Sequence, residues 1–102
     1  MNTQFFDLHE VVSRDEILAM LSWKDTTLAE QLKIKDDPFM WHRGIHFFQV
    51  QRNGKLTFNK RMIQLWLTAK SQNDTHMHLD AIALYQALVP RISQIQRRKR
   101  AI

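Results

Sequence analysis

The apolar and polar residues between Trp41 and Leu67 follow a pattern that predicts a β-hairpin and then, without a break, a helix. Two runs rich in aromatic and aliphatic residues flank Arg52-Asn53-Gly54, and an Asn-Gly pair between such runs is a strong hairpin signal. A three-residue loop at 52–54 pairs Phe58 with Phe48 and gathers one apolar face, made of Phe48, Val50, Leu56 and Phe58. A slip of one residue would scatter these side chains, so burial favours this register, with Phe47 left on the polar face.

Helical periodicity predicts two short helices before the hairpin. The first is expected over about 14–21, because Ser13 and Glu16 form a capping-box pattern in front of an apolar stripe. The second is expected over about 25–34, where Asp25 can cap it and Leu28 and Leu32 face inward. Its outer face is then made of Thr26, Thr27, Glu30, Gln31 and Lys33. Two short helices joined by a few residues form a helix-turn-helix pattern, which many small helical proteins share.

Two more helices are predicted after the hairpin. The first begins at Asn59, a good N-cap, and its inward face carries Met62, Ile63, Trp66 and Leu67. The second is expected over about 74–89, before Pro90, and its apolar stripe is Met77, Ala81, Leu84 and Leu88, beside Ile82, Tyr85 and Val89. This face is broad enough to pack on the core and on a second chain, so we expect a homodimer through the 75–89 helix.

Chain length predicts where the domain ends, and the distribution of charge predicts a class of partner. A chain of 102 residues suits one domain, here residues 1–90, and residues 91–102 read as a basic tail that is disordered when unbound. The net charge of +5 is unevenly placed. Residues 1–37 hold eight acids and four bases, whereas residues 38–73 hold six bases and no acid, and the tail holds five bases and no acid. A basic hairpin and a basic tail predict a polyanionic partner.

Composition excludes several classes of function. The chain has no cysteine, so it can form neither disulfides nor thiolate metal sites, and its two glycines are too few for a glycine-rich phosphate loop. No apolar run approaches the roughly 20 residues of a membrane span, and no signal-peptide pattern is present, so a cytoplasmic location is expected. No catalytic constellation, metal site or cofactor site is predicted, and the histidines are expected at the surface or at caps: His9, His42, His46, His76 and His78. Core packing is expected for Trp23, Trp41 and Phe47.

Helix, turn, helix and basic-tipped hairpin is the order of a winged helix, and the residues themselves resemble one family. Excisionase-like DNA-binding proteins carry a helix-turn-helix that this chain resembles in residues 13–32, SRDEILAMLSWKDTTLAEQL. Their wing and the short helix after it resemble residues 43–67, RGIHFFQVQRNGKLTFNKRMIQLWL. Residues 66–90, WLTAKSQNDTHMHLDAIALYQALVP, resemble a C-terminal extension of phage and mobile-element members. Two departures lie in the turn, where Ser22 replaces the usual glycine and Lys24 replaces a serine or threonine cap.

The resemblance implies a fold that is mainly α with a β-hairpin wing, namely a winged helix-turn-helix plus a C-terminal helix. It also implies that the second helix enters the major groove of double-stranded DNA while the wing contacts an adjacent minor groove. The implied role is that of a recombination directionality factor beside a site-specific recombinase, or of a small transcription regulator, associated with the nucleoid. Neither role is enzymatic.

The candidate DNA-binding residues fall into groups by the contact that each can make. Base edges can be read from the second helix by threonine, glutamine and lysine side chains, whereas cations on the wing, on the next helix and on the tail can neutralise phosphates. Lys60 and Arg61 lie at a helix N-terminus, which also offers free N–H groups to a phosphate. The full set is Lys24, Thr26, Thr27, Gln31, Lys33, Arg43, Arg52, Asn53, Lys55, Lys60, Arg61, Arg97, Arg98, Lys99 and Arg100. The alternative function is a protein–protein adaptor that uses the C-terminal helix and binds little DNA, which the acidic first third of the chain and Glu30 favour.

Overall fold

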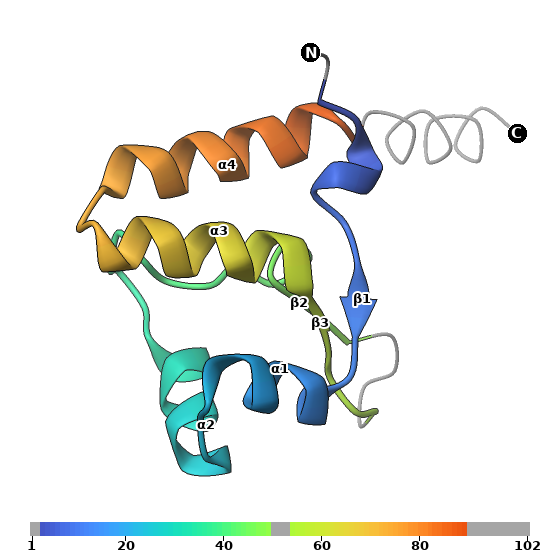
Figure 1. Cartoon of the computed structure of the whole chain (residues 1–102), viewed down its shortest axis with the longest axis vertical. Helices are drawn as coiled ribbons and strands as arrows, with labels where there is room; N and C mark the ends of the chain where they lie inside the picture. The colour runs from blue at the N-terminus through green and yellow to red at the C-terminus, as the bar shows by residue number, and fades with distance from the viewer. Residues whose placement is uncertain (1–2, 50–53, 90–102) are drawn as a thin grey trace, which may run out of the picture.

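The computed structural model describes residues 3–49 and 54–89 and contains, within them, four α-helices and one small three-stranded antiparallel sheet. The chain runs through the 3-10 helix η1 (Phe5–Asp7), β1 (Val11–Val12), α1 (Arg14–Leu21), α2 (Asp25–Lys33), β2 (Phe47–Phe48), β3 (Thr57–Asn59), α3 (Lys60–Ser71) and α4 (Thr75–Ala87) (Figure 1). Helix α4 lies along α3, while α1 and α2 lie on the opposite side of α3 (Figure 1). The mainly helical fold with a hairpin is therefore confirmed, and the expected tail at 91–102 lies outside the described residues.

The sheet corrects the predicted hairpin register by one residue. Phe58 pairs with Phe47, and Thr57 pairs with Phe48, so the expected pairing of Phe58 with Phe48 is wrong. The predicted register rested partly on burying Val50, which lies outside the described residues. Two contacts that the periodicity does not reveal accompany the observed pairing: the Gly44 N–H donates to the Phe47 carbonyl at 2.7 Å, and β1 pairs with the other edge of β3. Phe47 and Phe58 consequently share the buried face.

Local signals determine α1 and the turn after it. The helix spans the predicted residues, and the Ser13 hydroxyl accepts a hydrogen bond from the Glu16 N–H at 3.3 Å. The helix ends at Ser22, whose φ of 55° is left-handed. The Trp23 N–H donates to the Leu18 carbonyl at 3.0 Å and the Ser22 N–H donates to the Ala19 carbonyl at 3.3 Å, which is the Schellman pattern. This tight reversal turns the chain from α1 into α2.

Replacing Ser22 by glycine should stabilise the domain. A non-glycine residue in the left-handed region costs roughly 1–2 kcal/mol, which glycine avoids. Part of this gain is offset because glycine has more freedom in the unfolded chain. We expect Ser22→Gly to raise the free energy of unfolding by about 0.5–1 kcal/mol, as measured by thermal melting. Ser22→Val serves as the opposite control and should melt at a lower temperature than the parent.

The second helix begins as expected, but its inward face is wider than expected. Lys24 is the N-cap and supplies no side-chain hydrogen bond, and Asp25, expected as the cap, is the first helical residue. Leu28 is fully buried. Gln31, expected on the outer face, is also buried, and within the described residues its Nε2 has no hydrogen-bond partner. A spacing of three residues places Gln31 on the same side of the helix as Leu28, which explains this correction.

The core has two parts, and α3 contributes to both. Near α1 and α2 the buried residues are Ile17, Leu28, Phe39, Trp41, Phe47, Phe58, Ile63, Trp66 and Ala69. Near α4 they are Leu8, Ile45, Met62, Ile82 and Tyr85. The Trp41 ring packs against Trp66 and Trp23, with centroids 5.2 and 5.8 Å apart, so the expected core packing of the tryptophans is confirmed. The expected burial of Leu67 is wrong, because its side chain is 43% exposed.

Helix α4 packs on the core with most of the predicted face, since Ile82 and Tyr85 are buried and Met77, Ala81, Leu88 and Val89 are partly buried against the core. Its buried residues are His78, Ile82 and Tyr85, whereas Leu84, expected on the inward stripe, is 40% exposed. Two polar contacts lie on the buried face: His78 Nε2 donates to the Met40 carbonyl at 3.0 Å, and Tyr85 Oη lies 3.0 Å from His9 Nδ1. A count of apolar residues misses only His78, which is polar and fully buried on this face. The N-cap is Asp74, one of the candidates, which accepts from the Met77 N–H at 3.0 Å.

Candidate nucleic-acid interface

The exposed side of α2 carries neutral polar residues together with basic and acidic ones. Four predicted DNA-contacting residues are exposed there: Lys24, Thr26, Thr27 and Lys33. Glu30 is exposed on the same helix, and Asp25 accepts a hydrogen bond from Arg14 Nε of α1 at 3.0 Å. Positive and negative charges are therefore nearly balanced on α2. Such a surface suits selective contacts to base edges better than general attraction to phosphates.

A groove of about 370 Å³ separates the N-terminal end of α1 from residues 55–57 of the hairpin. Its lining residues are Ser13, Arg14, Asp15, Lys55, Leu56 and Thr57. The hairpin wall contributes the exposed Lys55 cation, whereas on the α1 wall Arg14 lies beside Asp15 and is paired with Asp25, so that wall carries no net positive charge. The positive charge of the groove therefore comes from Lys55, which can attract an anionic partner from the hairpin side.

Arg43 lies beside the hairpin rather than beside α2. Its Nη1 donates to Gln49 Oε1 at 3.0 Å, and its guanidinium lies 5.6 Å from the centroid of the Phe47 ring. Gln49 Nε2 in turn donates to the Gly54 carbonyl at 3.1 Å. Arg43 is exposed and therefore extends the hairpin's basic surface along its β2 side. The remaining wing candidates, Arg52 and Asn53, lie outside the described residues, as do Arg97, Arg98, Lys99 and Arg100.

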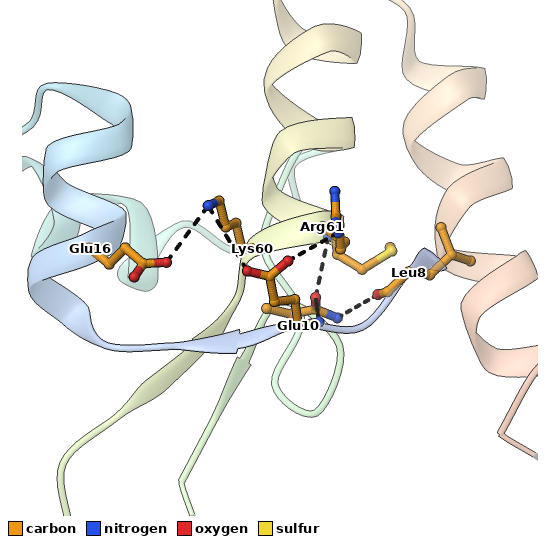
Figure 2. A network of polar contacts seen from close by, with 7 residues as sticks. Leu8, Glu10, Glu16, Lys60 and Arg61 are labelled. Atoms are coloured by element: carbon orange, nitrogen blue, oxygen red, sulfur yellow. Dashed lines mark hydrogen bonds and ion pairs between the residues drawn. The ribbon is translucent and has the colours of Figure 1, made fainter. Parts of the chain in front are cut away.

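Lys60 and Arg61, predicted to contact phosphates, form ion pairs with two acids from the beginning of the chain. The Arg61 Nε lies 3.1 Å from Glu10 Oε1, and the Lys60 Nζ lies 4.0 Å from Glu10 Oε2 and 3.8 Å from Glu16 Oε2 (Figure 2). Cations at a helix N-terminus are disfavoured by the helix dipole. The two carboxylates supply the compensating charge, so a phosphate is not needed to explain these cations.

Asn59 is the residue whose full role the sequence does not reveal. It was expected only as the N-cap of α3, and it does accept from the Met62 N–H at 3.4 Å. Within the described residues its side chain makes three more hydrogen bonds: Oδ1 accepts from the Glu10 N–H at 3.1 Å, and Nδ2 donates to the Leu8 and Ile45 carbonyls at 2.9 and 3.0 Å. Asn59 is fully buried. It thus joins the N-terminal segment, the hairpin and α3 at one point.

Two histidines are buried, which corrects the expectation of surface positions. His46 and His78 have exposed fractions of 0%, and their rings stack with centroids 5.2 Å apart. His46 Nδ1 accepts from the His42 N–H at 3.0 Å. Burial lowers the pKa of His46 to about 3, and the neighbouring His78 and His42 act in the same direction. Burial also lowers the pKa of His78. Among the described residues no cluster of histidine and carboxylate side chains could hold a metal ion.

Acid should therefore destabilise the fold. The unfolded chain protonates His46 near pH 6.5, whereas the folded chain keeps it neutral down to about pH 3. Because the unfolded state binds more protons in this range, the free energy of unfolding should fall as the pH drops through 6.5, with a slope that approaches about 1.4 kcal/mol per pH unit near pH 5. Urea unfolding at several pH values from 7 down to 5 measures the slope. His46→Gln should flatten it, and an unchanged slope would contradict the assignment.

In the part of the chain that the structure describes, no helix is long and apolar enough to cross a membrane. Comparisons with protein families, with curated proteins and with solved structures find no match for this chain.

Proposed function

We propose that this chain is a winged helix-turn-helix protein that binds double-stranded DNA, with α2 in the major groove and the β2–β3 hairpin against the neighbouring minor groove. The observation that carries the proposal is the α1–turn–α2 unit, in which left-handed Ser22 occupies the place of the glycine usual in this turn. The sheet places the hairpin close to that unit, because β1 leads directly into α1 and pairs with β3.

Two kinds of DNA contact are proposed, and they come from different elements. Base contacts come from Thr26, Thr27 and Lys33, which are exposed on α2, whereas Gln31 is buried and is no longer proposed as a base reader. Phosphate contacts come from Lys55 on the hairpin, joined by Lys24, Arg43 and the basic residues of the tail. Because α2 is nearly neutral, we expect it to supply selectivity while the hairpin and tail supply most of the affinity.

The biological role that this binding would serve is of one of two kinds. The resemblance to excisionase-like proteins supports a recombination directionality factor that acts beside a site-specific recombinase, and the same surface would serve a small transcription regulator. Both roles require DNA binding and no catalysis, cofactor or metal. Both also place the protein with DNA in the cytoplasm, associated with the nucleoid.

Binding to labelled duplexes tests the proposal, with a duplex selected from a random pool compared with a random duplex. Lys33→Ala should cost about 1–3 kcal/mol on the selected duplex and little on the random one, because a lysine can discriminate guanine. Lys55→Ala should weaken binding to both and flatten the slope of log affinity against log salt by about 0.9. Lys70→Ala, an exposed lysine of α3 outside the proposed interface, is the matched control. If the Lys33 and Lys55 variants bind every duplex like the parent, the proposal fails.

A second function is favoured by one observation on α4. The exposed side of this helix carries apolar residues among the polar His76, Asp80 and Gln86: Leu79 and Leu84 are 50% and 40% exposed, and Ala83 and Ala87 are exposed as well. An adaptor that binds a second copy or a recombinase through this face would use it. Light scattering measures self-association, and duplex binding is measured separately. The adaptor is favoured if the parent self-associates but binds no duplex, and if Leu79→Glu abolishes the self-association.

A further inference from the structure

The two cations in the first turn of α3, Lys60 and Arg61, are paired with acids from the beginning of the chain. The stretch 38–73 contains six bases and no acid, so a cation there finds its acidic partners only in distant parts of the chain. Lys60 and Arg61 find Glu10, just before β1, and Glu16, on α1. Figure 2 shows the Glu10 carboxylate between the two cations, while Glu16 reaches Lys60 from α1.

The backbone around Glu10 is held in place independently of its side chain. The Lys60 N–H donates to the Glu10 carbonyl at 2.8 Å, and the Glu10 N–H donates to Asn59 Oδ1 at 3.1 Å. The Glu10 carboxylate is therefore held near the two cations by an ordered backbone segment. Forming the ion pairs then costs less conformational entropy than a surface ion pair normally does. The pairs nevertheless remain open to solvent, because the exposed fractions of the Glu10 and Arg61 side chains are 39% and 50%.

These contacts have a consequence for binding to DNA, and it rests on the proposed function. A cation that reaches a phosphate adds affinity for every DNA sequence and steepens the salt dependence, because it releases a counterion. A cation that is already paired with a carboxylate must give up that pair first. We propose that Glu10, assisted by Glu16, keeps Lys60 and Arg61 out of phosphate contacts and thereby limits the affinity of this protein for random DNA. Glu10 is thus a specificity-determining residue, since selectivity depends on the ratio of specific to non-specific affinity.

Glu10→Gln tests this inference because it removes the charge and leaves the two backbone hydrogen bonds in place. Binding to a random duplex should tighten by about 5- to 10-fold at low salt, and the slope of log affinity against log salt should steepen by about 0.9 for each released cation. Asp80→Asn makes the same change in net charge on exposed α4, and Asp80 forms no ion pair among the described residues. This control should leave the slope unchanged.

A second set of variants distinguishes the effect of releasing Lys60 and Arg61 from the effect of changing the net charge. In a chain that already carries Lys60→Gln and Arg61→Gln, the Glu10→Gln change should have no more effect than Asp80→Asn. Equal effects of Glu10→Gln and Asp80→Asn in the parent chain, or no gain from Glu10→Gln, would overturn the inference. Melting temperatures of all variants should match the parent within a few degrees.

The outcome also distinguishes this inference from the proposed function. If Lys33→Ala and Lys55→Ala weaken binding as expected but Glu10→Gln leaves the slope unchanged, the DNA-binding proposal stands and the role of Glu10 is wrong. If Glu10→Gln creates binding to duplexes that is indifferent to Lys33 and Lys55, the masking role stands and the winged-helix interface is wrong. If neither the parent nor Glu10→Gln binds the duplex, both are overturned.

Discussion

Asn59→Ala is expected to lower the free energy of unfolding by about 4 kcal/mol or more, which would leave a domain of ordinary stability largely unfolded. The change removes the N-cap of α3 and leaves the partners of the other three hydrogen bonds unpaired. Two of these partners are the carbonyls of the buried residues Leu8 and Ile45. Each buried group left unpaired costs about 1–3 kcal/mol. Urea unfolding followed by circular dichroism measures the loss.

Asn59→Asp is the matched variant, because it keeps the shape and the accepting oxygen. Its second oxygen would face the Leu8 and Ile45 carbonyls, to which the amide now donates. The variant should therefore be strongly destabilised at pH 7, and its deficit relative to the parent should shrink at pH 5, where a protonated carboxyl can donate to one carbonyl. A variant as stable as the parent at pH 7 would show that these hydrogen bonds contribute little.

Phe58→Ala is the second change with a large expected effect, about 3–5 kcal/mol of unfolding free energy. The side chain has an exposed fraction of 0%, and its ring meets Trp41 edge-on with centroids 6.4 Å apart. Phe48→Ala is the control that tests the register, because Phe48 is only half-buried and pairs with Thr57. Its loss should be clearly smaller. Equal losses would favour the predicted register, in which Phe48 and Phe58 share the buried face. Urea unfolding followed by tryptophan fluorescence measures the loss of unfolding free energy in both variants.

Signals that act over a few residues were enough to predict the local structure. Ser13 and Asn59 each accept a hydrogen bond from the N–H three residues later, so the starts of α1 and α3 follow from the sequence itself. The Asn-Gly pair between two apolar runs likewise predicted the hairpin, and Asp74 was among the expected caps of α4. The candidate interface was partly predictable for the same reason, since the outward positions of Thr26, Thr27 and Lys33 follow from helical periodicity.

Only the tertiary structure decided how these elements meet. Contacts between residues far apart in the sequence set the register of β2 against β3, the polar partners of α4 and the partners of Lys60 and Arg61, such as Tyr85 with His9 and Arg61 with Glu10. An interpretation that assigns polar side chains to the surface could not anticipate the burial of Gln31, His46 and His78. The fold supplies one hydrogen bond to each buried histidine, from the His42 N–H to His46 and from His78 to the Met40 carbonyl, and these partners are brought together only when the chain folds.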